Sequence, residues 1–155
     1  EVIIMTLSQK ETTLLQDLKS QEQLCVDKYN KYSSDACDGQ LKNLFSQIGQ
    51  IEQQHLSTIT QILGGTVPTM GGGDTSQPTA TPQSTTPCTE QSKQHDKFLC
   101  TDALTTEKHV SSLYNTCVFE FKDTSIRNTL NHIQKEEQEH GEKIYSYMSQ
   151  NGMYS

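Results

Sequence analysis

Two stretches, IGQIEQQHL at residues 48–56 and IQKEEQEHG at residues 133–141, decide how this sequence folds. Each places a glutamate and a histidine three residues apart, so both side chains share one face of a helix. Each stretch also continues an apolar series with 3-4 spacing, which predicts helices that pack along a partner helix. A glutamate and a histidine in the middle of such an apolar face are unusual, because burying them is costly unless they are neutralised.

The two stretches are copies of one another within an internal repeat. Several residue types recur 85 positions later without a gap, including the apolar positions Leu41/Ile126, Ile48/Ile133 and Ile59/Ile144. The same offset relates the polar pairs Glu22/Glu107, Tyr29/Tyr114, Asn30/Asn115, Asp38/Asp123, Glu52/Glu137 and His55/His140. A repeated helical hairpin predicts a bundle with pseudo-twofold symmetry.

Helix signals and a linker divide the chain. We predict helices near 8–33, 38–63, 90–117 and 124–150. Ser8 with Glu11 forms a capping box. Asp38, Thr89 and Asp123 are the other predicted N-caps, and Gly64 and Gly152 stand where C-caps belong.

All four prolines and five of the nine glycines fall between residues 64 and 87, which predicts a linker over residues 64–88. The first hairpin is then residues 1–63 and the second residues 89–155, together forming one domain. Two hairpins joined end to end need a crossover of about 40 Å for helices of about 26 residues. A segment of about 25 residues spans that distance easily. The predicted fold is therefore an all-α antiparallel four-helix bundle with a long crossover.

The repeated acids and histidines predict a metal site in the bundle core. Four glutamates in a poorly solvated core must be protonated, hydrated or neutralised, and two divalent cations would balance their charge. Carboxylates with one imidazole per ion suit iron best, with manganese as the alternative. In this geometry Glu52 and Glu137 would bridge the ions, while the other four residues would be terminal ligands and Tyr29 and Tyr114 would donate hydrogen bonds to them. The predicted ligands are Glu22, Glu52, His55, Glu107, Glu137 and His140. The alternative is a metal-free bundle whose buried polar groups are held by hydrogen bonds, left by decay of a repeated site.

Composition excludes several classes of protein. The net charge of -7 argues against nucleic-acid binding, which needs clustered basic residues. No apolar run approaches the roughly 20 residues that a membrane helix requires. The first five residues lack the features of a signal peptide, so we expect a soluble protein made in the cytoplasm.

The five cysteines contain no Cys-x-x-Cys pair, which argues against zinc ribbons, rubredoxin-type iron centres and thioredoxin-like sites. Cys25, Cys100 and Cys117 lie on apolar faces and are expected in the core. Cys37 and Cys88 are expected to be exposed and available for disulfides between chains, which would favour self-association.

The remaining histidines and acids have simpler interpretations. No glutamate stands three residues before His95, His109 or His132, and these are expected at the surface. The charged residues around the second Glu-x-x-His are expected to form a solvated face, with one acid among them as an alternative extra ligand; they are Lys135, Glu136, Glu139, Glu142 and Lys143.

The paired Glu…Glu-x-x-His pattern, with a tyrosine seven residues after the first glutamate of each half, resembles the ferritin-like superfamily, which includes rubrerythrins, bacterioferritins and manganese catalases. The second half is more narrowly similar to the coat F family of spore coat proteins. That similarity rests on Thr106-Glu107-Lys108-His109, on Tyr114-Asn115, and on the ending from Tyr147 to Tyr154, where Gly-Met-Tyr stands in place of the Gly-Trp-Tyr of many members.

The resemblance implies a ferritin-like fold and deposition on the spore coat or spore surface among other coat proteins. Two functions follow as hypotheses. One is a structural spore coat protein that carries a di-metal site. The other is a di-iron or di-manganese oxidase, such as a ferroxidase, peroxidase or catalase.

Overall fold

The computed structural model describes residues 6–67 and 87–154. It contains four helices, α1 (Gln9–Asp35), α2 (Gly39–Leu63), α3 (Glu90–Glu120) and α4 (Thr124–Gln150). The all-α four-helix prediction is confirmed, and the predicted helix ends differ from the observed ones by three residues or fewer.

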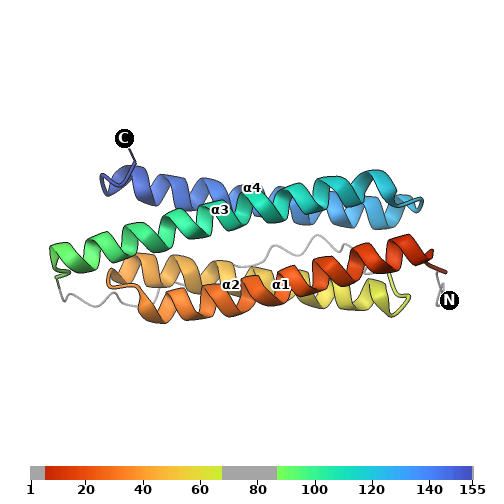
Figure 1. Ribbon diagram of the computed structural model, residues 1–155, viewed down its shortest axis with the longest axis horizontal. Coiled ribbons are helices and arrows are strands. Elements are labelled where there is room, and N and C mark those ends of the chain that lie inside the picture. The colour runs from red at the N-terminus through yellow and green to blue at the C-terminus, as the bar shows by residue number, and fades with distance from the viewer. Residues whose placement is uncertain (1–5, 68–86, 155) are drawn as a thin grey trace.

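The helices lie side by side as two hairpins (Figure 1). α1 packs mainly on α2 and α3 packs mainly on α4, while α1–α3 and α2–α4 contacts join the two hairpins. Adjacent helices run antiparallel, and α2 ends at the opposite end of the bundle from the start of α3 (Figure 1). Most of the predicted linker, residues 68–86, lies outside the described residues, so the division into hairpin, linker and hairpin stays a prediction.

The apolar faces meet along the length of the bundle. Removing such side chains from water contributes about 1.5–3 kcal/mol for each large one. Cys25, Cys100 and Cys117 are buried free thiols, as predicted. The largest fully buried side chains are Leu15, Leu18, Tyr29, Leu41, Phe45, Ile48, Ile59, Ile62, Tyr114, Ile126, Leu130 and Ile133.

Three predicted N-caps are confirmed. Ser8 and Glu11 form the reciprocal capping box at the start of α1. The Thr89 and Asp123 side chains accept hydrogen bonds from the backbone of their own helices α3 and α4. At the C-termini, Gly64 caps α2 and Gly152 follows α4 with a φ of 68°, a left-handed conformation that favours glycine.

Asp38 stands at the predicted N-cap position of α2, but its side chain makes no capping hydrogen bond; the turn before the helix is held from another helix. The buried carboxylate of Asp96, on α3, accepts from the backbone N–H groups of Cys37 at 2.8 Å and Asp38 at 3.0 Å. Asp38 instead accepts a hydrogen bond from the Tyr147 hydroxyl at 2.7 Å. The start of α2 is therefore fixed by the opposite hairpin.

The other hairpin turn is held in the same way. Glu11 on α1 accepts from the backbone N–H of Lys122 at 3.4 Å, and these two residues stand 85 positions from Asp96 and Cys37 respectively. Each hairpin thus places an acid against the turn of the other, which fixes the register between them.

A disulfide joins Cys37, in the turn between α1 and α2, to Cys88, just before α3, with their Cα atoms 6.0 Å apart. The expectation that these cysteines are available for disulfides between chains is corrected, because each is bonded to the other within the chain. Self-association by another route stays a prediction.

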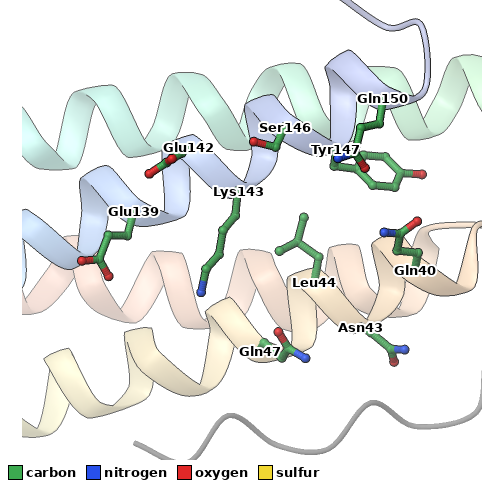
Figure 2. A pocket seen from close by; sticks show the side chains of 10 residues that line it. All are labelled: Gln40, Asn43, Leu44, Gln47, Glu139, Glu142, Lys143, Ser146, Tyr147 and Gln150. Carbon is green, nitrogen blue, oxygen red and sulfur yellow. The ribbon is translucent and has the colours of Figure 1, made fainter. Parts of the chain in front are cut away.

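A groove of about 590 Å³ separates α2 from α4 toward one end of the bundle (Figure 2). Glu139 and Glu142 lie on its α4 side and are exposed, as predicted, while Leu44 rises from α2 between polar neighbours. Within the described part of the chain, no helix has the length and apolar character needed to cross a bilayer.

Candidate metal centre

Six polar side chains from all four helices meet inside the bundle, and none exposes more than 3% of its surface. Glu22 comes from α1, Glu107 from α3, and each Glu-x-x-His pair from α2 or α4. Their donor atoms form two groups, and within each group the atoms lie within 4.8 Å of one another. One group is Glu22, Glu52, His55 and Glu137, and the other is Glu52, Glu107, Glu137 and His140.

The two histidines turn the same nitrogen toward the carboxylates. His55 Nδ1 lies 2.9 Å from Glu137 Oε1 and 3.3 Å from Glu52 Oε2. His140 Nδ1 lies 3.0 Å from Glu52 Oε1 and 3.6 Å from Glu107 Oε1. Glu52 and Glu137 belong to both groups, so either carboxylate could contact two cations at once. The structure thus brings the predicted ligands together, while metal binding itself stays a prediction.

Tyr29 and Tyr114 hold the two terminal glutamates in a reciprocal arrangement. The Tyr29 hydroxyl donates to Glu107 Oε1 at 2.5 Å, and the Tyr114 hydroxyl donates to Glu22 Oε1 at 2.5 Å. Both tyrosines are fully buried, and each reaches the glutamate of the opposite hairpin. Hydrogen bonds of this kind fix the orientation of a ligating carboxylate.

Three buried carboxylate oxygens in the cluster lack a hydrogen-bond partner among the described residues. They are Oε2 of Glu22, Glu107 and Glu137. A buried oxygen without a donor is destabilising by about 1–3 kcal/mol, and by more when it is charged. Hard divalent cations bind such oxygens together with imidazole nitrogen, so the donor set fits iron or manganese.

Burial and mutual proximity shift the titration of the acids. Burial, reinforced by nearby Glu52, raises the pKa of Glu22 well above its usual value. Burial, reinforced by nearby Glu107, does the same to the pKa of Glu137. Burial also acts to raise the pKa of Glu52, but hydrogen bonds with both histidines hold it well below its usual range. Of Glu22, Glu52 and Glu137, Glu52 is therefore the acid most readily ionised.

The histidines are shifted toward the protonated form. Burial acts to lower the pKa of His55, but hydrogen bonds with Glu136 and Glu52 and the charge of Glu22 raise it to about 10. The pKa of His140 is likewise raised, because Glu107, Glu137 and Glu52 outweigh its burial. Without metal, the cluster is balanced by protons.

Glu136 departs from the sequence-based expectation of a solvated face. Its side chain is only 20% exposed, and its Oε1 lies 3.1 Å from His55 Nε2 and 3.0 Å from His132 Nε2. The hydrogen bond with His55 lowers the pKa of Glu136 and fixes the ring so that Nδ1 faces the cluster. The only sequence signal was the four-residue spacing of His132 and Glu136, which does not reveal contact with another helix. The residue 85 positions earlier is Ile51, so one hairpin alone has this contact.

His95 and His109 are exposed, as predicted, and so is His132 apart from its contact with Glu136. Lys135 and Lys143 are also exposed, and Lys135 lies 3.8 Å from Glu139 across one helical turn. The solvated face of α4 is therefore as expected except at Glu136.

Comparison with known proteins identifies a family to which this chain is similar. Residues 95–155 match the Coat F domain. The chain is also 34% identical over 79 residues to the uncharacterized protein YusN of Bacillus subtilis (strain 168), an alignment that covers 51% of this chain and 70% of YusN. The chain belongs to the Coat F domain family. No solved structure matches it significantly.

The Coat F match covers nearly all of α3 and the whole of α4. It therefore includes Glu107, Glu137 and His140 but not the ligand candidates of the first hairpin. Half of the cluster lies inside the region that defines the family and half lies outside it.

Proposed function

We propose that this Coat F family protein is a structural protein of the spore coat or spore surface, with a ferritin-like bundle that binds two ions of iron or manganese. Family membership supports the coat role. The antiparallel bundle with paired Glu-x-x-His sequences supports the ferritin-like assignment. The observation that carries the metal site is the cluster of four buried glutamates, three of which keep an oxygen without a hydrogen-bond partner among the described residues.

In this proposal Glu22 and His55 bind one ion, Glu107 and His140 bind the other, and Glu52 and Glu137 bridge them. Two divalent ions neutralise the four carboxylates and replace the protons that otherwise occupy the site. Tyr29 and Tyr114 orient the terminal carboxylates, and Glu136 orients His55. The ions would join the two hairpins at the centre of the bundle and stabilise it through binding.

Metal analysis of the natively purified protein tests the site. We expect about two equivalents of metal per chain, and loss of most of it in both Glu52→Ala and Glu137→Ala, because each removes a ligand shared by both ions. Glu139→Ala is the matched control, since Glu139 is an exposed acid on the same helix. Helical circular dichroism should confirm that every variant is folded. A folded wild-type protein that binds no iron or manganese at micromolar free metal would exclude the site.

Fractionation of spores tests the coat role separately. An antibody against the chain should detect it in the coat fraction of spores from its source organism. Its presence in extracts of sporulating cells together with its absence from that fraction would contradict a coat function.

The alternative is a di-metal oxidase. Each proposed ion receives one ligand atom from each of four residues, which leaves coordination positions open. A redox-active pair of ions in such a site can exchange electrons with dioxygen or peroxide. The test is oxygen consumption or peroxide decomposition by the fully loaded protein, with Glu137→Ala as the inactive control. Metal binding without turnover would leave the structural role.

A further inference from the structure

The two hairpins differ in how far apolar side chains shield the buried cluster from solvent. In the first hairpin Val26 on α1 and Leu56 on α2 are 6% and 8% exposed, so apolar side chains cover this side of the site. Gly49 lets α1 and α2 approach closely, since a Cβ there would lie only 3.4 Å from Tyr29 Cβ and from the Asn30 side chain. Apolar side chains and a close helix contact therefore flank the cluster at these positions.

The second hairpin carries different residues at the same three places. Ser111, Gln134 and Gly141 stand 85 positions after Val26, Gly49 and Leu56. The Gln134 side chain occupies the place of the small Gly49 and donates to the Ser111 carbonyl on α3 at 3.0 Å, bridging the two helices. A Cβ on Gly141 would meet nothing closer than Leu104 Cδ1 at 3.7 Å, an ordinary van der Waals contact, so a larger side chain could be placed there. The apolar cover is therefore present beside the first hairpin and absent at the equivalent positions of the second.

A groove of about 490 Å³ lies between α3 and α4 at these residues. Glu107 and Glu137 line it, although they are only 3% and 1% exposed, and each keeps an oxygen without a partner among the described residues. The larger groove between α2 and α4 (Figure 2) has none of the six cluster residues among those that line it. Of these two grooves, only the one between α3 and α4 reaches the acids.

We propose that the α3–α4 groove is the route by which a hydrated divalent cation enters the cluster. This inference rests on the proposed metal site. Ser111 supplies an oxygen atom along the groove that can replace water around the ion, which its apolar counterpart Val26 cannot do on the opposite side. The ion reaches Glu107 and Glu137 first, so the position next to His140 fills before the position next to His55. The buried position is reached through the shared glutamates.

The test introduces the apolar residues of the first hairpin at the equivalent positions of the second. In the double variant Ser111→Val/Gly141→Leu, the rate of Co²⁺ uptake, followed by visible absorption after rapid mixing, should fall by about tenfold or more, because the apolar shell around a metal site controls solvent access. The equilibrium stoichiometry should remain that of the wild type. Ser146→Val is the matched control, because Ser146 lines the other groove and its substitution should leave the uptake rate unchanged.

A milder variant covers the case in which the double variant folds poorly or binds less metal. Gly141→Ala adds one methyl group at an ordinary contact distance and should slow uptake by a smaller but measurable factor without altering stoichiometry. Uptake at the wild-type rate in folded variants that still bind the wild-type amount of Co²⁺ would overturn the entry route and leave the metal site standing. A wild-type protein that takes up no metal at all would overturn the site itself, and the route with it.

Discussion

Loading the cluster with metal should release protons in a number that the structure sets. Metal ligands must be deprotonated, and the metal-free cluster holds protons on its histidines and on part of its carboxylates. The pKa of His55, raised to about 10 chiefly by its hydrogen bonds with Glu136 and Glu52, places an imidazolium there at neutral pH. The raised pKa of His140, which follows from Glu107, Glu137 and Glu52, places a second one beside it.

The magnitude follows from this count. Two divalent ions should displace at least about two protons at pH 7, and up to about four if Glu22 and Glu137 are also protonated. Removing the proton from His55 at pH 7, about three units below its folded pKa, costs about 4 kcal/mol. The apparent dissociation constant should therefore fall by about tenfold per pH unit for each proton displaced, from neutral pH up to about pH 9.

Isothermal titration with Mn²⁺ in two buffers of different ionisation enthalpy measures the released protons directly. His109→Ala is the control, because this exposed histidine should not alter the count. Release of fewer than about one proton for each pair of bound ions would refute the idea that protons balance the metal-free cluster.

The same protons should make the metal-free protein less stable as the pH rises. The raised pKa of His55 contributes stability that is complete below 6.5 and is lost as the pH rises through about 10. The raised pKa values of Glu22 and Glu137 act in the same direction above 4.5, whereas the lowered pKa of Glu52 contributes stability that is lost only as the pH falls below 4.5. Denaturant unfolding in the presence of a chelator should show a falling free energy of unfolding between neutral pH and pH 10. A free energy that rises over this range would contradict the shifts.

Three further predictions concern single contacts. Asp96→Ala should lower the free energy of unfolding by about 1–3 kcal/mol, because two backbone N–H groups in the turn before α2 lose their acceptor. Chemical denaturation under non-reducing conditions measures this change, and an unchanged midpoint would contradict the role of these hydrogen bonds. Tyr114→Phe should weaken metal binding by about 10–100-fold, because it removes the hydrogen-bond donor to Glu22. Equilibrium metal titration measures the affinity, and an affinity equal to that of the wild type would contradict this role for Tyr114. Reduction of the disulfide between Cys37 and Cys88, which are 51 residues apart, should destabilise the bundle by up to about 4 kcal/mol, whereas Cys88→Ser should be insensitive to reductant.

Much of the fold follows from local pattern. The 3-4 spacing and the capping residues set the four helices, because these signals depend on residues close together in the sequence. The convergence of the six polar side chains follows from the repeat, since equivalent positions of a pseudo-twofold bundle must face one another. Metal occupancy does not follow from either pattern.

The contacts that the sequence did not reveal all join distant elements. Asp96 is an ordinary acid near the start of a helix, and nothing local indicates that it accepts hydrogen bonds from the turn between α1 and α2. Glu136 carries a charge beside others on α4, and only the packing of α2 against α4 turns it toward His55. Cys37 and Cys88 are brought together by the position of α3 relative to the turn between α1 and α2. The sequence around either cysteine does not indicate that position.

The crossed tyrosine contacts have a consequence for ancestry. Each hairpin supplies a hydroxyl to the other hairpin's carboxylate, so one hairpin by itself contains half of the buried polar cluster. A shorter chain with a single hairpin of this kind could complete the cluster only by pairing with a second copy of itself. Gene duplication and fusion would then turn that dimer into one polypeptide, after which the two halves could diverge, as Val26 and Ser111 have done.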